Sequence, residues 1–248
     1  MITVISKHLG LFHERWPIPD EDYLGAIHYI EQIRYKGSQF QHLCTSNINA
    51  PVGFSPGIDV SGEELNHLYS SMIIWFELES FIKTGKSFLD HLWRLIAQNH
   101  PEINTDNNLK NQKYISQAFN ELKKKDHKFK ASKAYEAINN SLNIWGRYLV
   151  GFRNYIEYSE PLGGMLSSVA GRIEVKVENS ITTKNVILPD SFPHYKENKK
   201  AFQFTFNSGI GASGFLLTIV KNIDDVFPLI VSEIHNKSLQ RTGWGSVA

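Results

Sequence analysis

The feature that most constrains the fold is one long amphipathic pattern, which begins at Ser61 and continues to about Asn99. Ser61 followed three residues later by Glu64 predicts a capping box at a helix N-terminus. Apolar residues then recur at helical spacing as far as Pro101. A helix of about 35–40 residues is roughly 55 Å long, well beyond the usual length in globular domains. Such a helix needs partners along its whole length, so the pattern predicts a helical bundle, with Gly85 as the expected place for a kink or break.

Further helices are predicted on both sides of this one. Acidic residues at 20–22, followed by apolar positions at helical spacing, predict a helix that Gly37 ends. Asn222, with two aspartates soon after it, is the expected N-cap of a closing helix. The predicted ranges are 19–36, 109–125, 130–158 and 222–239.

Beyond a Pro-Gly turn at 161–164, the pattern changes to strand-like alternation. Ile173, Val175 and Val177 alternate with charged residues and predict a strand. The other expected strands are 184–188, joined to the first by a turn at 179–183, and 202–206; the stretch 215–220 is either a fourth strand or the start of a buried helix. Helices followed by a run of strands indicate a mainly α protein, a helical bundle with two long helices and a small antiparallel β insertion, α+β overall.

These elements divide the chain into four segments. A chain of 248 residues is long enough for one large domain with an elaboration. The expected segments are 1–60, an N-terminal helix and loop that pack on the bundle; 61–160, the bundle core; 161–221, the antiparallel β element; and 222–248, a closing helix and tail.

Charge and cysteine content narrow the function classes. Lys+Arg 26 against Asp+Glu 25 leave a formal charge of +1, so no basic field over the whole chain points to nucleic acid. The single cysteine, Cys44, excludes an internal disulfide and a cysteine-based zinc site. Glu64 and His67 form an E-x-x-H pair, but a di-iron bundle needs a second copy, so they are interpreted as an exposed first turn. No metal and no cofactor is therefore expected.

Neither membrane insertion nor export is expected. The apolar clusters at 72–76 and 215–220 are far shorter than the ~20 residues that a membrane-spanning helix needs. The first twenty residues contain charged and histidine side chains and no small-residue cleavage site, so a secretory leader is not predicted. The expected location is the cytoplasm.

A glycine motif, G-x-G-x-x-G, lies between Gly209 and Gly214. A dinucleotide site needs this motif inside a βαβ unit, where the last glycine opens a helix. Because an antiparallel strand is predicted before it and an apolar, strand-like segment after it, the motif is interpreted as a flexible strand connection.

A lysine-rich segment interrupts the otherwise balanced charge. From Lys110 to Lys133, eight lysines are opposed only by Glu121 and Asp126, which leaves a local charge of +6. Such a segment either contacts a phosphate backbone or forms a solvated corner between helices, and both readings stay open. The candidate binding lysines are Lys123, Lys124 and Lys125.

The stretch 151–158, at the end of the second long helix, contains Arg153 and Asn154 and ends at Tyr158. This pattern resembles the R-x(4–6)-H motif of the HEPN (higher eukaryotes and prokaryotes nucleotide-binding) family in its common Arg-Asn form. The context is also similar, because an earlier long helix carries Glu-Leu-Glu-Ser-Phe at 77–81 and a Pro-Gly turn follows the motif. The resemblance implies a helical bundle that forms a homodimer with its motif residues near the two-fold axis. Active members of the family are metal-independent RNases, often toxins or antiviral factors.

The chemistry implied by the resemblance depends on position 158. In that chemistry a histidine handles a proton at the ribose 2′-hydroxyl while arginine stabilises the phosphate charge. In this chain Tyr158 stands where the histidine belongs. A phenol with a pKa near ~10 is a poor general base at neutral pH, whereas imidazole near ~6.5 is suited to the task. We therefore expect a non-catalytic or weakly active protein that binds RNA or a nucleotide through Arg153, in a defence or toxin–antitoxin setting.

Two alternatives stay open. One is a metal-independent RNase whose catalytic residues are Arg153, Asn154 and Tyr158. The other is a structural dimer or scaffold without a ligand, in which Arg153 pairs with Glu157 on the helix surface. The acidic residues of the first long helix are interpreted as exposed positions rather than acid–base partners: Glu77, Glu79 and Asp90.

Overall fold

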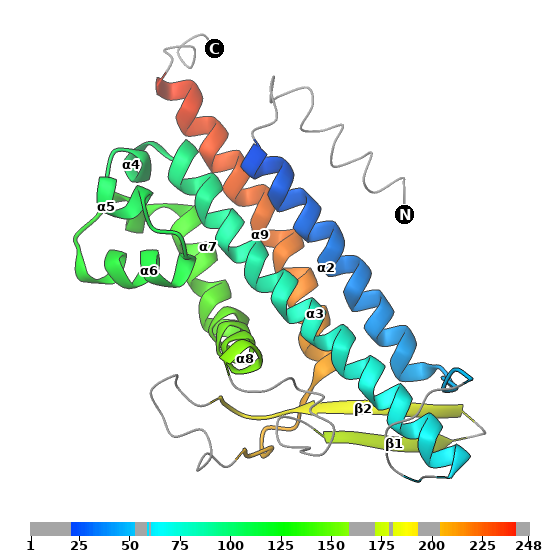
Figure 1. Cartoon of the computed structure of the whole chain (residues 1–248). Helices are drawn as coiled ribbons and strands as arrows, with labels where there is room; N and C mark the ends of the chain where they lie inside the picture. Colours follow the sequence, from blue (N-terminus) through cyan, green and yellow to red (C-terminus); the bar gives the residue numbers. More distant parts are fainter. Residues whose placement is uncertain are drawn as a thin grey trace.

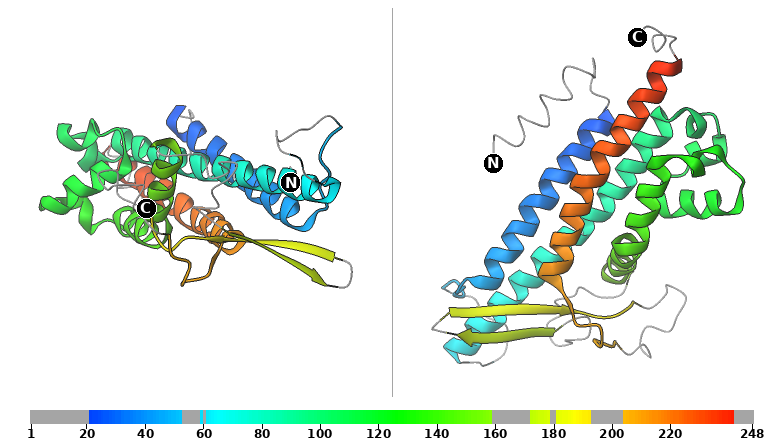
Figure 2. Two further views of the ribbon diagram at one scale, coloured as in Figure 1. Left: turned by 60° about the horizontal axis from the view of Figure 1, so that its bottom comes forward. Right: turned by 180° about the vertical axis from the view of Figure 1, so that it is seen from behind.

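Three long helices run side by side and form the body of the molecule (Figure 1). The structure is a computed structural model that describes residues 21–52, 59, 61–158, 172–178, 181–192 and 204–241. The three helices are α2 (Glu21–Thr45), α3 (Gly62–Asn99) and α9 (Ala212–Arg241). Seen from behind, α9 lies over α2 and α3, and the sheet crosses the base of the bundle (Figure 2). The predicted mainly α bundle with a small antiparallel sheet is confirmed.

The N-terminus of α3 is capped as the sequence predicts. Oγ of Ser61 accepts a hydrogen bond from the backbone N–H of Glu64 at 3.3 Å, and the Glu64 carboxylate accepts one from the Ser61 N–H at 2.9 Å. The predicted break at Gly85 is wrong, because α3 runs unbroken through it. A Cβ at Gly85 would lie 2.9 Å from Cδ1 of Leu149, so this glycine instead lets another helix approach closely.

Helix α2 does not end at Gly37, as predicted, but continues to Thr45. The reason is that the apolar stripe continues beyond the glycine. Phe40 and Cys44, four residues apart, are both buried against the core. A Cβ at Gly37 would lie 3.4 Å from the ring of Phe81, so the glycine serves helix packing rather than termination.

A lateral lobe of short helices projects from the C-terminal end of α3 (Figure 1). The elements that follow α3 are α4 (Pro101–Asn104), α5 (Asn107–Lys110), α6 (Ile115–Lys124), a 3₁₀ turn (Lys128–Ala131), α7 (Lys133–Ser141), a π-helical turn (Leu142–Gly146) and α8 (Arg147–Tyr158). The predicted helix at 109–125 is therefore two helices, because Asp106 caps one of them and Asp90 accepts a hydrogen bond from the N–H of Ile115 at the start of the next. The predicted helix at 130–158 begins later, at Lys133, where Ser132 is the N-cap.

The described residues form a sheet of three strands in the order β1-β2-β3. Strand β1 (Arg172–Glu178) pairs antiparallel with β2 (Ile181–Leu188), which confirms the predicted hairpin, although pairing already starts at Glu178 and Ile181 and the turn is shorter than predicted. The short β3 (Ile210–Gly211) pairs with the other edge of β2. Val186 and Leu188 of β2 are buried, and β2 contacts α2 and α9.

The third strand predicted at 202–206 is not formed by its described residues, 204–206; residues 202 and 203 lie outside the described part. Asp190, which follows the end of β2, binds this segment through hydrogen bonds instead. Its N–H donates to the carbonyl of Thr205 at 2.8 Å, and its carboxylate accepts from the N–H groups of Asn207 and Ser208 at 2.9 and 2.8 Å. Hydrogen bonds to the carboxylate, first from the Thr205 side chain and then from the N–H of Ser208, lower the pKa of Asp190 to about 2.

The closing helix begins at Ala212 rather than at Asn222. Residues 215–220 are therefore helical, which resolves the alternative that the sequence left open. Leu216, Ile219 and Ile223 are buried at spacings of three and four, so the helical stripe starts well before the predicted cap. The predictions for 1–20 and for the turn at 161–164 lie outside the described residues. No described helix is long and apolar enough to cross a membrane.

Candidate anion-binding site

Arg153 and Asn154 lie next to one another on α8. Both are half-buried, and Nη1 of Arg153 donates to Oδ1 of Asn154 at 3.1 Å. They follow Val150 by three and four residues, so they adjoin it on the helix surface. Tyr158 ends the helix, but its side chain and that of Glu157 lie outside the described part, and with them the predicted pairing of Arg153 with Glu157.

The three candidate lysines do not form one cluster. Nζ of Lys124 lies 2.7 Å from Glu121, and Nζ of Lys125 lies 3.4 Å from Asp106. Lys123 instead lines a cavity on another side of α6. The three separate because consecutive residues of a helix point about 100° apart, and Lys125 already lies beyond the helix end.

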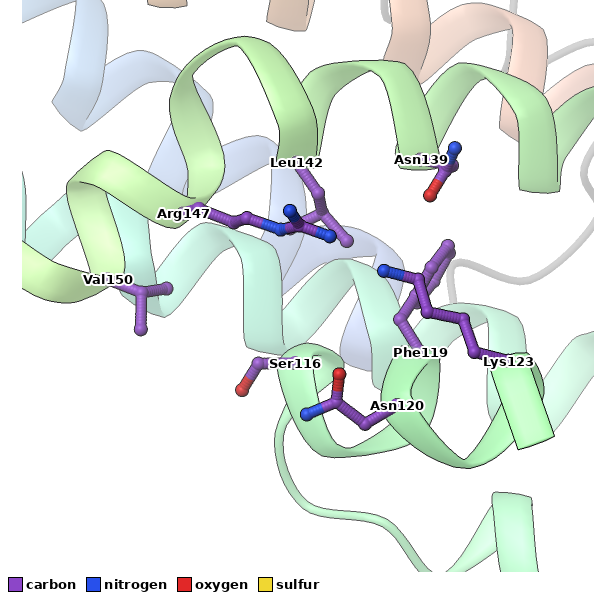
Figure 3. Close-up of a pocket in the computed structure, with 8 residues that line it drawn as sticks. All are labelled: Ser116, Phe119, Asn120, Lys123, Asn139, Leu142, Arg147 and Val150. Atoms are coloured by element: carbon purple, nitrogen blue, oxygen red, sulfur yellow. The ribbon is translucent and has the colours of Figure 1, made fainter. Parts of the chain in front are cut away.

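The cavity lies between α6 and the chain that runs from α7 through the π-helical turn into α8 (Figure 3). Its volume is about 190 Å³. The buried side chains of Phe119 and Leu142 contribute apolar surface. The described residues that line it are Ser116, Phe119, Asn120, Lys123, Asn139, Leu142, Arg147 and Val150.

Two cationic side chains face each other across this cavity. The ammonium of Lys123, from α6, and the guanidinium of Arg147, from α8, extend toward one another (Figure 3). No described Asp or Glu lines the cavity, and neither cation forms an ion pair with a described residue. Two like charges that converge without a carboxylate between them favour an anion in the space that they share. Arginine and lysine together are the usual ligands of phosphate.

The π-helical turn shapes this side of the cavity. Such turns insert one residue into a helix and occur often at functional sites. Leu142, its first residue, lines the cavity, and Arg147 follows directly after its last residue. A Cβ on Gly146 would lie 2.8 Å from Cδ2 of Leu142, so the absence of a side chain at 146 allows Leu142 to keep its position.

Sequence reasoning missed Arg147 and the two asparagines of the cavity, Asn120 and Asn139. Arg147 is exposed between the buried positions Trp145 and Leu149, as any solvated helix residue would be. Only the packing of α6 beside the α7–α8 segment brings it opposite Lys123. The sequence offers one cue for Arg147: no Asp or Glu lies three or four residues from it.

The prediction that the acidic residues of α3 are exposed is wrong for two of them. Glu79 and Asp90 are buried. Asp90 pairs with Lys86 and accepts from the N–H of Ile115, and the ammonium of Lys86 lies 4.3 Å from the ring centre of Tyr114. A buried charge is stable only when it is paired and hydrogen-bonded in this way, so Asp90 joins α3 to α6.

The glycine motif lies where β3 passes into α9, with Gly209 at a φ of +57°. The prediction of a strand-like segment after it is wrong, because a helix follows. The sheet is antiparallel, however, so the βαβ unit that a dinucleotide site requires is not formed by the described residues.

The described residues contain no group of three or more His, Cys, Asp or Glu side chains placed to hold a metal ion. Burial, the main cause, raises the pKa of the Cys44 thiol to about 11, against the smaller opposing effects of Lys184 and Ser213. A thiol in this state is a poor nucleophile. Among the described residues, the cavity between α6 and α8 is therefore the arrangement with the clearest chemical property, the ability to bind an anion.

Comparison of the chain with protein-family models, with curated proteins and with solved structures finds no match.

Proposed function

We propose that the protein is a HEPN-like, non-catalytic or weakly active protein that binds RNA or a nucleotide through its phosphate. The observation that carries the proposal is the pair of cations, Lys123 and Arg147, which face one another across a cavity whose described lining includes no carboxylate. Arginine binds phosphate in a bidentate manner and lysine as a point charge, so the pair is suited to one phosphate group.

The surface around the cavity is suited to further phosphates of an RNA backbone. Arg153 and Asn154 follow Val150 by three and four residues on α8. The side of α8 that faces the cavity therefore continues to these two residues of the HEPN-like motif. Of the eight lysines between 110 and 133, two form ion pairs with carboxylates and one donates to an asparagine. The lysines that have no partner among the described residues are Lys113, Lys123, Lys128, Lys130 and Lys133.

The proposal includes a homodimer, because the resemblance to the HEPN family implies that two copies of the Arg153 motif share one groove. Light scattering coupled to size-exclusion chromatography measures the molar mass of the protein in solution. A mass of two chains is expected. A strictly monomeric protein that still binds RNA would remove the shared groove from the proposal and leave the cavity of a single chain.

The phosphate contacts are tested by the binding of a fluorescent single-stranded RNA oligonucleotide, followed by anisotropy at low salt. We expect Lys123→Ala and Arg147→Ala each to weaken binding about tenfold or more, because each removes a charge-assisted hydrogen bond to phosphate. Each variant should also make the affinity less dependent on salt, since fewer counterions are released.

Lys124→Ala is the matched control, because Lys124 is the next residue on α6 but pairs with Glu121 away from the cavity. Equal affinities for wild type and all three variants would contradict the proposal. The same RNA incubated with the protein in EDTA distinguishes binding from the RNase alternative. With a tyrosine at position 158 we expect the RNA to remain intact.

A further inference from the structure

We infer that the cavity between α6 and α8 accepts one unpaired nucleobase together with its phosphate, that Asn120 and Asn139 read the edge of the base, and that adenine is preferred. The inference rests on the proposed function, because it assigns the ligand of the same cavity. It adds recognition of a base to the electrostatic recognition of phosphate.

The size of the cavity limits its occupant. About 190 Å³ is below the range of roughly 300–1,000 Å³ of pockets that enclose a drug-sized ligand. A dinucleotide cofactor or a base pair therefore does not enter, whereas one planar base does. Lys123 and Arg147 are exposed, which leaves the phosphate of that base in contact with solvent.

The lining is suited to a base. Phe119 and Leu142 are buried, and with Val150 they provide an apolar surface for a flat ring. Phe119 is itself held by stacking on Tyr135, with ring centres 5.3 Å apart and planes within 4° of parallel. The apolar surface is therefore rigid, which favours a ligand that packs against it.

The two amides supply the hydrogen bonds. Asn120 lies on α6 and Asn139 on α7, so they approach the cavity from opposite sides (Figure 3). Neither side chain has a hydrogen-bond partner among the described residues. An amide carries both a donor and an acceptor, so each is free to pair with the edge of a base.

The composition of the lining favours adenine. Asparagine pairs in a bidentate manner with N6 and N7 of adenine, whereas cytosine suits a carboxylate acceptor, and the described lining residues include no carboxylate. Arginine and lysine suit guanine, but here both cations are assigned to the phosphate. A preference for guanine would therefore reassign Arg147 to the base and overturn the inference.

The test compares AMP, GMP, CMP, UMP and inorganic phosphate by isothermal titration calorimetry on the full-length protein. AMP is expected to bind most tightly. Asn120→Ala and Asn139→Ala are each expected to reduce the ratio of AMP to UMP affinity about tenfold while phosphate binding stays unchanged. Asn140→Ala, an exposed neighbour that does not line the cavity, should keep the wild-type ratio.

An unchanged AMP to UMP ratio in both asparagine variants would overturn base recognition. Near-ultraviolet circular dichroism of each variant verifies that the protein is folded, and the two variants lie on different helices, so a folding defect in one does not affect the other. If RNA binds and depends on Lys123 and Arg147 while the four nucleotides bind equally, only this inference fails. If neither RNA nor phosphate binds, the proposed function fails with it.

Discussion

At the scale of single residues, small side chains decide how closely the helices approach. Gly85 admits Leu149 against α3, and Gly146 admits Leu142 within the π-helical turn. A Cβ would come within 2.9 and 2.8 Å of these leucines, respectively, distances that require a neighbour to move. The second contact has a functional consequence, because Leu142 lines the proposed binding cavity.

Gly146→Ala should therefore lower both stability and ligand affinity. The added methyl group overpacks the buried Leu142, which typically costs about 1–3 kcal/mol, and it displaces an apolar side chain of the cavity. Urea denaturation measures the free energy of unfolding, and RNA anisotropy measures binding. Gly214→Ala is the control: it adds a methyl group to α9 with nothing within 4 Å, so an equal or higher stability is expected. Wild-type stability in Gly146→Ala would show that Leu142 relaxes without cost.

Position along the chain, and not residue type, decides which candidate lysines are available. Lys123, Lys124 and Lys125 are chemically identical and adjacent in the chain. Their roles differ because the helix turns each one toward a different surface, and Glu121 and Asp106 neutralise two of them. Sequence alone assigns one charge cluster to these residues, whereas the fold leaves a single member of the three in the cavity.

At the scale of elements, α7 is positioned by a carboxylate from α9. Oε2 of Glu233 accepts from the N–H of Ala134 at 2.6 Å, in the first turn of α7. Its other oxygen lies 3.4 Å from Nε2 of the buried His100 and 3.5 Å from Nζ of Lys237. One side chain thus connects α9 to the start of α7 and to the end of α3, and α7 carries one wall of the cavity.

Replacement of this carboxylate should loosen α7. In Glu233→Ala the N–H of the buried Ala134 loses its acceptor, and an unsatisfied buried donor costs about 1–3 kcal/mol. The free energy of unfolding in urea is the measurement. Ser232→Ala, an exposed neighbour on the same helix, should match wild type. If Glu233→Ala were as stable as Ser232→Ala, the connection between α7 and α9 would be energetically unimportant.

The same network couples the stability of the whole molecule to pH. His100 is completely buried. Burial is the main reason that its pKa lies below the ordinary 6.5, and the positive charge of Lys237 adds to it, against the opposing effects of Glu102 and Glu233. Below about pH 6.5 the unfolded chain takes up a proton that the folded protein does not, so the free energy of unfolding falls as the pH falls.

We expect this loss of stability to begin below about pH 6.5, with a slope of at most about 1.4 kcal/mol per pH unit, the limit for one proton. Urea denaturation at a series of pH values between about 7.5 and about 5 gives the slope. These values span roughly one to two units on either side of the ordinary histidine pKa. His100→Gln should flatten it, whatever its effect at pH 7. His42→Gln, at an exposed position, should keep the wild-type slope. An unaltered slope in His100→Gln would assign the pH dependence to other groups.

The distribution of charge is also a property of the whole molecule. The total of 26 basic and 25 acidic residues is nearly neutral. The fold nevertheless places Lys123 and Arg147 together from different helices and leaves several lysines of the lateral lobe without partners among the described residues. A local positive surface therefore coexists with a neutral molecule, which confines any contact with an anion to one region.

Signals that act between near neighbours could be predicted from the sequence. The cap at Ser61 and the proline at 101 define the long helix, and alternation over 173–177 defines a strand of the hairpin. The predicted stop at Gly37 and the predicted helix start at Asn222 are wrong, and so is the predicted strand at 202–206 over its described residues, 204–206. At Gly37 and before Asn222 the buried apolar stripe of the helix continues past the predicted boundary, and at 204–206 hydrogen bonds with Asp190 and its neighbours outweigh the local alternation.

The residues of the candidate site fall into the same two groups, those that the sequence indicates and those that it does not. Lys123, Arg153 and Asn154 were found from a charge run and a short motif, whereas Arg147, Asn120 and Asn139 have no local signature. The sequence by itself determined the helical class, the length of α3 and the presence of a hairpin, because capping and periodicity are local. Only the tertiary structure decided that α6 lies beside α8 and encloses a cavity with two cations, because that depends on which buried faces meet across the chain.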